Sequence, residues 1–394
     1  MKDLKILHID DLCTGCGACA NICPKKCIEV KPNKEGFYYP YYNSNNCIEC
    51  GLCEKTCHVL SSDQKPIRQN NIYIYRTKDD ILLEKSTSGG AFSLFADYVL
   101  REGGIVYGSR YNSDRELLEV CSTNECSMDA LRKSKYIESF TGESYKEIKK
   151  HLKCGRKVLF CGTPCQVSGL IHYLNATRTH IENLITLDFV CHGVPSNKCF
   201  TEFKHTQETE NNKIINVDFR YKNFHKRIFW HHMTLALVYQ DKSVKVVSPY
   251  YYYYYYKPFI QNLILRKSCY QCDKVVKSSA DFTIGDFWAV IRYRPEIDDN
   301  RGLSFIKVNN INKLTLLQSL AKDGLFEEMP FEVNKGQFRN RSWEKYLIER
   351  NKFFRNVEKN GYITTIKSQY HLNSIKKLYL ETFGRIKYFL RKIK

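Results

Sequence analysis

The stretch CTGCGACANICPKKC, from Cys13 to Cys27, places four cysteines at gaps of two, two and three residues, with a proline after the fourth. Nearly the same run returns further along the chain. The two sets of thiols are Cys13, Cys16, Cys19 and Cys23, then Cys47, Cys50, Cys53 and Cys57. A zinc site usually takes its ligands as two pairs, whereas each run here supplies three ligands close together and a fourth soon after. This spacing is typical of proteins with two 4Fe–4S clusters, and it predicts iron–sulfur binding.

The fourth cysteine of each such run binds the cluster of the other run. We therefore expect one cluster to be held by Cys13, Cys16, Cys19 and Cys57, and the second by Cys47, Cys50, Cys53 and Cys23. The second run departs from the pattern at its end, where His58 replaces the proline. Gly15, Gly17 and Gly51 allow the backbone to bend close to the inorganic sulfurs. Cys27 lies outside the pattern, and we expect it to be a small buried apolar residue.

The beginning of the chain, MKDLKILHIDD, has neither the apolar stretch nor the cleavage site of a signal peptide, so we expect a cytoplasmic protein. Disulfides seldom persist in that compartment, which favours metal binding for clustered thiols. No stretch approaches eighteen consecutive apolar residues, and we expect no membrane span.

The net charge of +19 is uneven, because residues 341–394 hold fourteen Lys or Arg against four Asp or Glu. Ser374 to Lys394 alternate apolar and cationic residues at near-helical spacing. This pattern suggests peripheral contact with the inner face of the membrane, and a solvated helix resting on the body is the alternative.

The run YYYYYYY, from Tyr250 to Tyr256, looks like a stacking platform for nucleic acid. In a strand, however, successive rings would point to opposite faces, so we expect a strand or helix edge between layers. No recognised nucleic-acid-binding module accompanies the run, and we predict no nucleic-acid partner.

The organisation of the chain follows from changes in pattern. Residues 1–65 are predicted to form a two-cluster ferredoxin-type domain, and Ser61 to Asn71 read as a polar linker. Short strands and apolar-periodic helices then alternate, which predicts a mixed α/β body. We divide that body into 72–150 and 151–325 and expect 335–394 to be a basic helical tail. The fold class is thus α+β or α/β, with a bacterial-type ferredoxin domain first.

Two cysteine motifs of the body each follow a buried strand and precede a helix. They are CGTPC, with Cys161 and Cys165, and VCHGVPS, with Cys191; a third motif, CYQC, supplies Cys269 and Cys272. Ligands in open α/β sheets bind beyond the carboxyl ends of the strands. Thr163-Pro164 is a good helix start, and the helix N-terminus favours a thiolate at Cys165.

These five thiols exceed the four that one further cubane requires. A redox-active disulfide between Cys161 and Cys165 is an alternative, as are plain buried cysteines. The other cysteines of the body have no motif, and we expect them to be structural: Cys121, Cys126, Cys154 and Cys199.

The sequence STSGG, from Ser86 to Gly90, precedes a predicted helix. Backbone N–H groups and the helix dipole make such a position an anion site, and glycines permit close approach by a pyrophosphate. Taken alone, the motif more often serves only as a helix cap.

A resemblance to a known family rests on five motifs taken together. STSGGAFSLFADYVL, VLFCGTPCQVSGL, LDFVCHGVPS, CYQC and DFTIGDFW follow the cysteine runs in this order. They resemble the coenzyme F420 hydrogenase/dehydrogenase beta subunit family, from the first cysteine run to about Asn309. The resemblance implies one FAD, a 4Fe–4S cluster in the body, and redox chemistry on a deazaflavin or a related substrate. It implies that four of the five body thiols hold this cluster, and that FAD phosphate is bound by Thr87, Ser88, Gly89 and Gly90. We expect Cys161 to be the spare thiol, because Cys165 lies at the helix terminus and Cys269 and Cys272 form a pair.

We therefore expect an iron–sulfur flavoprotein oxidoreductase that passes electrons between a small-molecule hydride donor or acceptor at FAD and one-electron carriers such as soluble ferredoxin. His192 and Asp286 are candidate catalytic residues, and Asp281 is a candidate cofactor contact. The alternatives are hydrogen bonding from His192 to cluster sulfur and strand-end carboxylates in turns. The alternative function is an electron-transfer or accessory subunit in a cell-envelope polysaccharide pathway, without substrate chemistry of its own.

Overall fold

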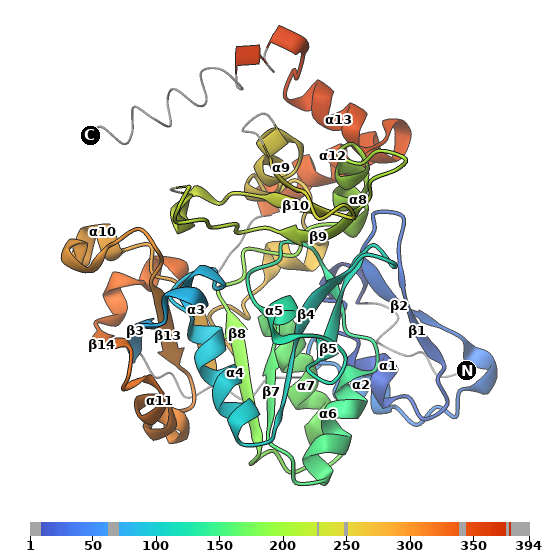
Figure 1. Ribbon diagram of the computed structural model, residues 1–394. Coiled ribbons are helices and arrows are strands. Elements are labelled where there is room, and N and C mark those ends of the chain that lie inside the picture. The colour runs from blue at the N-terminus through green and yellow to red at the C-terminus, as the bar shows by residue number, and fades with distance from the viewer. Residues whose placement is uncertain are drawn as a thin grey trace.

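The computed structural model describes residues 9–61, 71–226, 228–247, 251–338, 344–375 and 378–379. Figure 1 shows the N-terminal cysteine-rich unit on one flank of a larger body, with the late helices packed across one end. The fold class expected from the sequence is confirmed: a ferredoxin-like unit, a large mixed α/β body and C-terminal helices. Within the described ranges, no helix is long and apolar enough to cross a membrane.

The two cysteine runs have the same local fold. Helix α1 (Ala18–Ile22) and helix α2 (Leu52–Thr56) each begin after a glycine with positive φ, 77° at Gly17 and 69° at Gly51. That backbone conformation favours glycine, and it turns each cysteine-bearing coil into its helix. The C-cap residues of these helices are Cys23 and Cys57, the fourth thiols of their runs. Strands β1 (Ile28–Pro32) and β2 (Tyr38–Tyr42) form the antiparallel hairpin between the runs.

The body is built on a sheet of nine strands in the order β14-β3-β13-β12-β8-β7-β4-β5-β6. Their bounds are β3 (Ile72–Arg76), β4 (Ile105–Asn112), β5 (Leu117–Ser122), β6 (Ser139–Phe140), β7 (Val158–Cys161), β8 (Leu184–Phe189), β12 (Phe282–Asp286), β13 (Ser304–Val308) and β14 (Leu325–Met329). Strands β4, β7, β8 and β12 are parallel neighbours. Strand β3 has the same direction, because it is antiparallel to β13, which is antiparallel to β12. Five strands therefore present their carboxyl ends at one edge.

The two faces of this sheet carry different helices. Helix α4 (Ala91–Arg101) packs on one face, where Val106 and Leu159 join its core. Helices α6 (Ser144–Lys153) and α7 (Pro164–Ala176) pack with Ile105 and Val158 in a separate core. Because alternate residues of a strand point to opposite faces, these cores lie on opposite sides of the sheet. Helices α1 and α2 contact α7, so the ferredoxin-like unit lies on the α7 side.

A smaller antiparallel sheet covers one end of the body (Figure 1). It contains β9 (Ile214–Asp218), β10 (Ala236–Tyr239) and β11 (Val244–Val246). Strand β10 pairs antiparallel with both β9 and β11. The remaining helices are α3 (Asp80–Glu84), α5 (Met128–Leu131), α8 (Asn197–His205), α9 (Tyr256–Ile260), α10 (Val290–Tyr293), α11 (Leu314–Ala321), α12 (Glu344–Asn360) and α13 (Tyr362–Gln369).

The tyrosine run is helical rather than extended. Residues Tyr251–Tyr254 form a 3-10 turn and Tyr256 begins α9. Tyr254, Tyr255 and Tyr256 are buried among aromatic residues of the core, and Tyr255 donates a hydrogen bond to the carbonyl oxygen of Tyr136 at 2.6 Å. These rings lie between layers, as the structural alternative required, but the reasoning from strand alternation was wrong.

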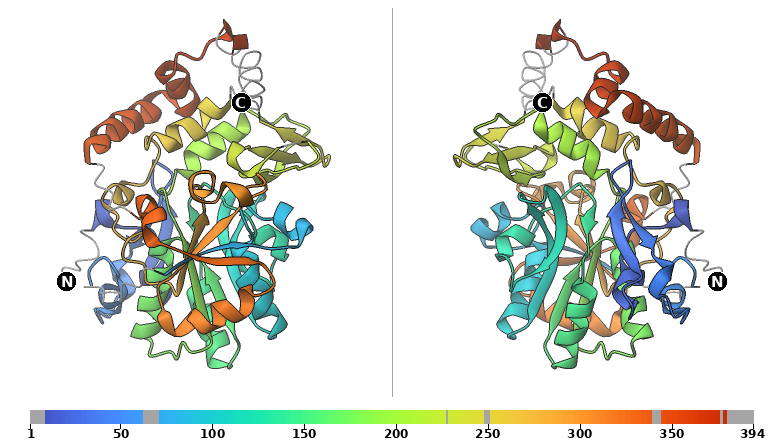
Figure 2. Two further views of the ribbon diagram at one scale, coloured as in Figure 1. Left: turned by 90° about the vertical axis from the view of Figure 1, so that its left-hand side faces the viewer. Right: turned by 90° about the vertical axis from the view of Figure 1, so that its right-hand side faces the viewer.

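Figure 2 shows the C-terminal helices at the same end of the molecule as the smaller sheet, and side-chain ion pairs join α12 to the ferredoxin-like unit. Arg350 on α12 is fully buried and donates to both carboxylate oxygens of Glu35 in the β1–β2 hairpin. Its Nε donates to the carbonyl oxygen of Leu265 at 3.0 Å. Most of the segment from Ser374 to Lys394 lies outside the described residues, and its contact with a membrane stays a prediction.

Candidate iron–sulfur centres and nucleotide site

The sequence motifs of the body meet at one edge of the large sheet. Strand β3 leads toward STSGG, β7 ends at Cys161 of CGTPC, β8 is followed by VCHGVPS, and β12 ends at Asp286. All four strands point in the same direction, so the segments that follow them emerge on the same side of the sheet. This edge is where open α/β sheets bind their ligands.

The first set of N-terminal thiols surrounds a cavity. Its lining includes Cys13, Cys16, Cys19 and Cys57, together with His58 and the glycines between the ligands. Burial, together with negative charges on Cys57 and Cys13, raises the pKa of Cys16 to about 12. A thiol cage of this kind is stable only when a cation compensates the thiolates. The geometry fits the predicted ligand set of one 4Fe–4S cluster.

The second set lies nearer the surface. Besides burial, a charge on Cys23 raises the pKa of Cys53, and charges on Cys23 and Cys47 raise the pKa of Cys27. Backbone N–H groups point at two of the sulfurs: Cys27 N–H donates to Cys23 Sγ at 3.2 Å, and Glu49 N–H donates to Cys47 Sγ at 3.3 Å. Such bonds stabilise thiolate ligands. Cys27, expected to be structural, is buried beside this set.

The body contributes a third group of thiols. Desolvation raises the pKa of the half-buried thiol of Cys269, and charges on Cys191 and Cys272, and on Cys165 to a smaller degree, add to that rise. The backbone N–H of Val194 donates to Cys269 Sγ at 3.3 Å. Three separate segments of the chain therefore bring four cysteines together. This set is the one that the sequence analysis favoured for a body cluster.

Helix α7 begins as the sequence indicated. Thr163 is its N-cap in a capping box with Gln166, and Pro164 occupies the first turn. The helix terminus does not dominate the chemistry of Cys165, however, because burial raises the pKa of this thiol, while the hydrogen bond with Thr163 only opposes that rise. The thiolate expected from the helix dipole alone therefore requires a metal in addition.

Cys161 has different surroundings. The charges that act on it are those of Asp188 and Lys135, and its side chain packs in the core of the α4 face. Cys165 belongs instead to the group near Arg266 and Cys269. The structure therefore favours Cys161 as the thiol outside the body group.

The ferredoxin-like unit and the body group meet on α7. Gly169 lies one turn after Cys165, and a Cβ atom built on it would come within 2.8 Å of Cys16 Sγ. The negative charge of Cys165 acts on Cys16. Only a residue without a side chain lets the two thiol groups approach this closely.

Arg266 is a buried cation between the same two groups. Its Nε donates to the carbonyl oxygen of Cys13 at 2.9 Å, and its Nη1 donates to Glu138 at 3.0 Å. Its second terminal nitrogen donates to the carbonyl oxygen of Tyr38, whose own N–H donates to Glu138 at 3.0 Å. The charges of Cys13 and Cys269 both act on this guanidinium. Sequence reasoning missed Arg266 and Glu138 because neither lies in a motif.

The STSGG loop caps α4, and its four candidate residues have different roles. Gly90 is the N-cap with φ 94°, while the N–H of Gly89 donates to Ser304 Oγ at 2.9 Å. A Cβ on Gly89 would lie 2.1 Å from the carbonyl oxygen of Tyr75, so this glycine is required by packing. Ser88 Oγ is buried without a hydrogen-bond partner among the described residues. An orphaned hydroxyl beside a helix N-terminus fits a bound phosphate group.

A group of basic side chains adjoins this loop. Lys222 is buried and donates to the carbonyl oxygens of Leu83 at 2.7 Å and Ser88 at 3.4 Å. Burial, with the positive charges of Lys133 and Arg220, lowers the pKa of Lys222 to about 7. An anion bound nearby would offset the charges that these residues impose on one another.

The remaining candidate residues, Asp281, Asp286 and His192, have different surroundings. Both carboxylate oxygens of Asp281 are engaged, one by Thr186 at 2.9 Å and one by Asn310 at 2.7 Å, which favours the structural alternative over a cofactor contact. Asp286 lies at the carboxyl edge, paired with Arg220 at 2.8 Å. The ring of His192 lies 4.9 Å from that of Phe259.

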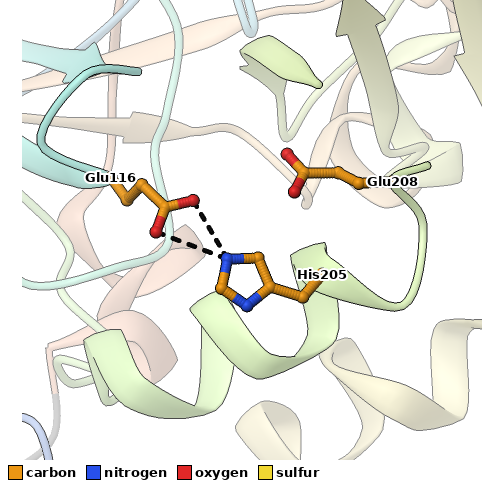
Figure 3. Close-up of side chains that lie close together, drawn as sticks. All are labelled: Glu116, His205 and Glu208. Carbon is orange, nitrogen blue, oxygen red and sulfur yellow. Dashed lines mark hydrogen bonds and ion pairs between the residues drawn. The ribbon is translucent and has the colours of Figure 1, made fainter. Parts of the chain in front are cut away.

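A further group of side chains resembles a metal site but has a different explanation. Figure 3 shows Glu116, His205 and Glu208 close together, with His205 Nε2 3.0 Å from Glu116. The buried ammonium of Lys204 already bridges the two carboxylates, at 2.5 Å from Glu116 and 2.6 Å from Glu208. The Lys204 ammonium therefore already lies where a metal ion would have to bind the two carboxylates.

The thiol groups and the fold define the class of protein: a chain with a two-cluster ferredoxin domain joined to a redox body. Comparison with known families agrees. Residues 12–60 match the 4Fe-4S dicluster domain, and residues 155–334 match the C-terminal region of the coenzyme F420 hydrogenase/dehydrogenase beta subunit. The chain thus carries a region that matches a 4Fe-4S dicluster domain, followed by a region similar to the C-terminal part of this beta subunit.

Two individual proteins are similar over parts of the chain. Pyruvate synthase subunit PorD of Thermotoga maritima is 60% identical over 25 residues, which are 6% of this chain and 25% of that protein's length. The solved structure of the F420-reducing [NiFe] hydrogenase complex from Methanosarcina barkeri matches with a TM-score of 0.46 and 16% identity. That match covers 73% of this chain and 94% of the other.

Proposed function

We propose that the chain is a flavin-dependent iron–sulfur oxidoreductase that passes electrons between a two-electron donor or acceptor and one-electron carriers. The observation that carries this proposal is the succession of thiol groups, in which the first N-terminal group contacts α7 at Gly169 and the body group begins one turn earlier at Cys165. FAD would exchange a hydride as two electrons, and 4Fe–4S clusters would carry the electrons singly.

Three sets of ligands follow for the clusters. The first is Cys13, Cys16, Cys19 and Cys57, and the second is Cys23, Cys47, Cys50 and Cys53. The third is Cys165, Cys191, Cys269 and Cys272. Cys50 of the second set is exposed, so this set is the one that a soluble ferredoxin or another redox protein can approach.

The residues that would hold FAD lie around the STSGG loop. Ser88 supplies the unpartnered hydroxyl, Gly90 opens the N-terminus of α4, and Thr87 accepts a hydrogen bond from Ser134 N–H at 2.7 Å. Lys222 donates to the carbonyl oxygen of Ser88 in this loop and to that of Leu83 in the preceding helix. Gly89 contributes close packing rather than a phosphate contact. The donor or acceptor would bind at the same carboxyl edge, near Asp286 and His192.

The test is the cofactor content of protein purified without oxygen. Three cubanes predict about twelve irons per chain. Cys165→Ser should lower the count to about eight, whereas Cys161→Ser, in the same loop, should leave it unchanged. An iron count equal to that of the wild type in both variants would show that the body group holds no cluster.

Flavin is tested separately by Ser88→Ala, with Ser86→Ala as the control, because Ser86 Oγ already donates to the carbonyl oxygen of Leu82 at 2.7 Å. We expect weaker FAD binding only in the first variant. Bound clusters without any flavin in the wild type would refute the flavoenzyme and favour the accessory electron-transfer role.

A further inference from the structure

Two cysteines outside all the proposed ligand sets lie side by side on the α4 face of the sheet. Cys121 is in β5, and Cys126 follows the turn after this strand. Their Sγ atoms are 2.8 Å apart, and both are free thiols. A covalent S–S bond measures about 2.0 Å, so a small approach of the two side chains would bring them to bonding distance.

The turn between them holds this arrangement. The N–H groups of Glu125 and Cys126 both donate to the carbonyl oxygen of Ser122, at 2.9 and 3.1 Å. The Glu125 carboxylate in turn accepts the N–H of Ser122 at 2.8 Å. These bonds hold the backbone of the turn that places Cys126 beside Cys121.

The two thiols are unlike each other. Cys121 is 3% exposed, and its contact with Cys126, together with burial, raises its pKa. The same contact, with the charges of Arg110 and Lys135, lowers the pKa of Cys126, which is half-buried. An accessible thiol with thiolate character beside a buried second thiol is the arrangement that favours thiol–disulfide exchange.

A half-buried lysine, Lys135, lies between this pair and the nucleotide loop. Lys135 donates to the carbonyl oxygen of Arg132 at 2.6 Å and lies within electrostatic range of Cys121, Cys126 and Cys161. The adjacent Ser134 donates its N–H to Thr87 at 2.7 Å. This hydrogen bond thus joins the segment of chain that follows the two cysteines to the proposed FAD loop.

We propose that Cys121 and Cys126 form a reversible dithiol–disulfide couple, a second two-electron centre of the body. Cys126 as thiolate attacks one sulfur of a low-molecular-weight disulfide and releases one thiol. Cys121 then displaces the second thiol and closes the Cys121–Cys126 bond. The protein loses two protons and two electrons, and one external disulfide becomes two thiols. This couple requires neither flavin nor clusters, so its test is independent of the proposed function.

The experiment equilibrates the whole, anaerobically purified protein in buffers of reduced and oxidised glutathione. Acid stops exchange, and a first alkylating reagent labels every free thiol under denaturing conditions. Reduction and a second reagent of different mass then label the thiols that had been in disulfides. We expect mass spectrometry to find the second label on Cys121 and Cys126 together, rising with the fraction of oxidised glutathione and reversing on reduction.

Variants make the result specific. Cys121→Ala should leave Cys126 as a mixed disulfide with glutathione, because the resolving thiol is gone. Cys154→Ala is the control: Cys154 is exposed and follows α6, and its loss should leave the couple unchanged. The proposal fails if both thiols carry only the first label across the whole series. It fails equally if Cys126 pairs with Cys161, the third thiol near Lys135.

Discussion

The buried ion pair between Arg266 and Glu138 offers the sharpest test of how the ferredoxin-like unit is attached. Both side chains are nearly inaccessible, and the pair contacts Cys13 and Tyr38 of that unit. Arg266→Met leaves Glu138 buried without its counter-ion, and breaking such a pair typically costs about 3–5 kcal/mol. With a urea dependence of about 3 kcal/mol per molar, the unfolding midpoint should fall by about 1 M or more.

The double variant separates the ion pair from its other contacts. Glu138→Gln keeps the shape of the side chain and removes its charge. In Arg266→Met/Glu138→Gln no buried charge remains, so the double variant should be more stable than the sum of the two losses predicts, by more than about 1 kcal/mol. Lys34→Met is the control, since Lys34 pairs with Glu358 at 2.8 Å on the open surface and such pairs contribute about 0–1 kcal/mol.

Anaerobic urea unfolding, followed by far-UV circular dichroism and by the visible absorbance of the clusters, provides the assay. Loss of the cluster absorbance before loss of helicity would show that the unit detaches first, as the position of Arg266 implies. Strictly additive losses, or a midpoint for Arg266→Met within error of the wild type, would refute the view that this pair joins the unit to the body.

Three further predictions follow from buried contacts. Asp188 is fully buried, and burial raises its pKa to about 7, so its protonated form is favoured on folding and the associated stability is lost as pH rises toward 7. Asp188→Asn should therefore gain on the wild type by about 2–3 kcal/mol between pH 5 and pH 8 in urea unfolding, and a constant difference would contradict this. Gly169→Ala should disturb the cluster at Cys16, seen as an altered electron paramagnetic resonance signal of the reduced protein, and an unchanged signal would mean that the two do not press together. Arg350→Met should lower the urea midpoint by about 1 M through the lost pair with Glu35, at about 3 kcal/mol, and a surface-like loss below about 1 kcal/mol would show that the C-terminal helices are dispensable.

Local sequence patterns predicted the parts of this fold that depend on neighbouring residues. The glycines before α1 and α2 and the capping residues of α7 specify backbone turns within a few residues, and their structural consequences could be stated in advance. Likewise β3, β7 and β8 were recognisable from short apolar runs. For the tyrosine run the prediction left strand and helix open, because an unbroken stretch of one residue type has no period, and the described part of the run is helical.

The site was predictable only where a motif carried it. The spacing of the cysteines in the two runs predicts their chemistry. Arg266, Glu138 and Lys222 lie in no motif, and only their tertiary contacts indicate a role. Asp281 shows the reverse case: it lies in a family-like motif, yet its carboxylate is occupied by the sheet. Cys121 and Cys126 were expected to be structural because their spacing matches no ligand pattern, and only the turn brings their sulfurs together.

The attachment of the cysteine-rich unit explains why these roles fall to single residues. Electron transfer between carriers requires fixed separations, and a tethered domain with polar, mobile contacts would vary them. Here Thr141 donates to the carbonyl oxygen of Cys16 at 3.1 Å, and Asn21 donates to that of Gly142 at 2.8 Å. The first bond reaches the backbone of a cysteine run, and the second joins a side chain of that run to the backbone of the body. Arg266 adds a buried charge at the same junction, where it donates to the carbonyl oxygen of Cys13. The body therefore holds the ligand loops directly, which makes the junction, rather than the linker, the element that sets the separation between the proposed centres.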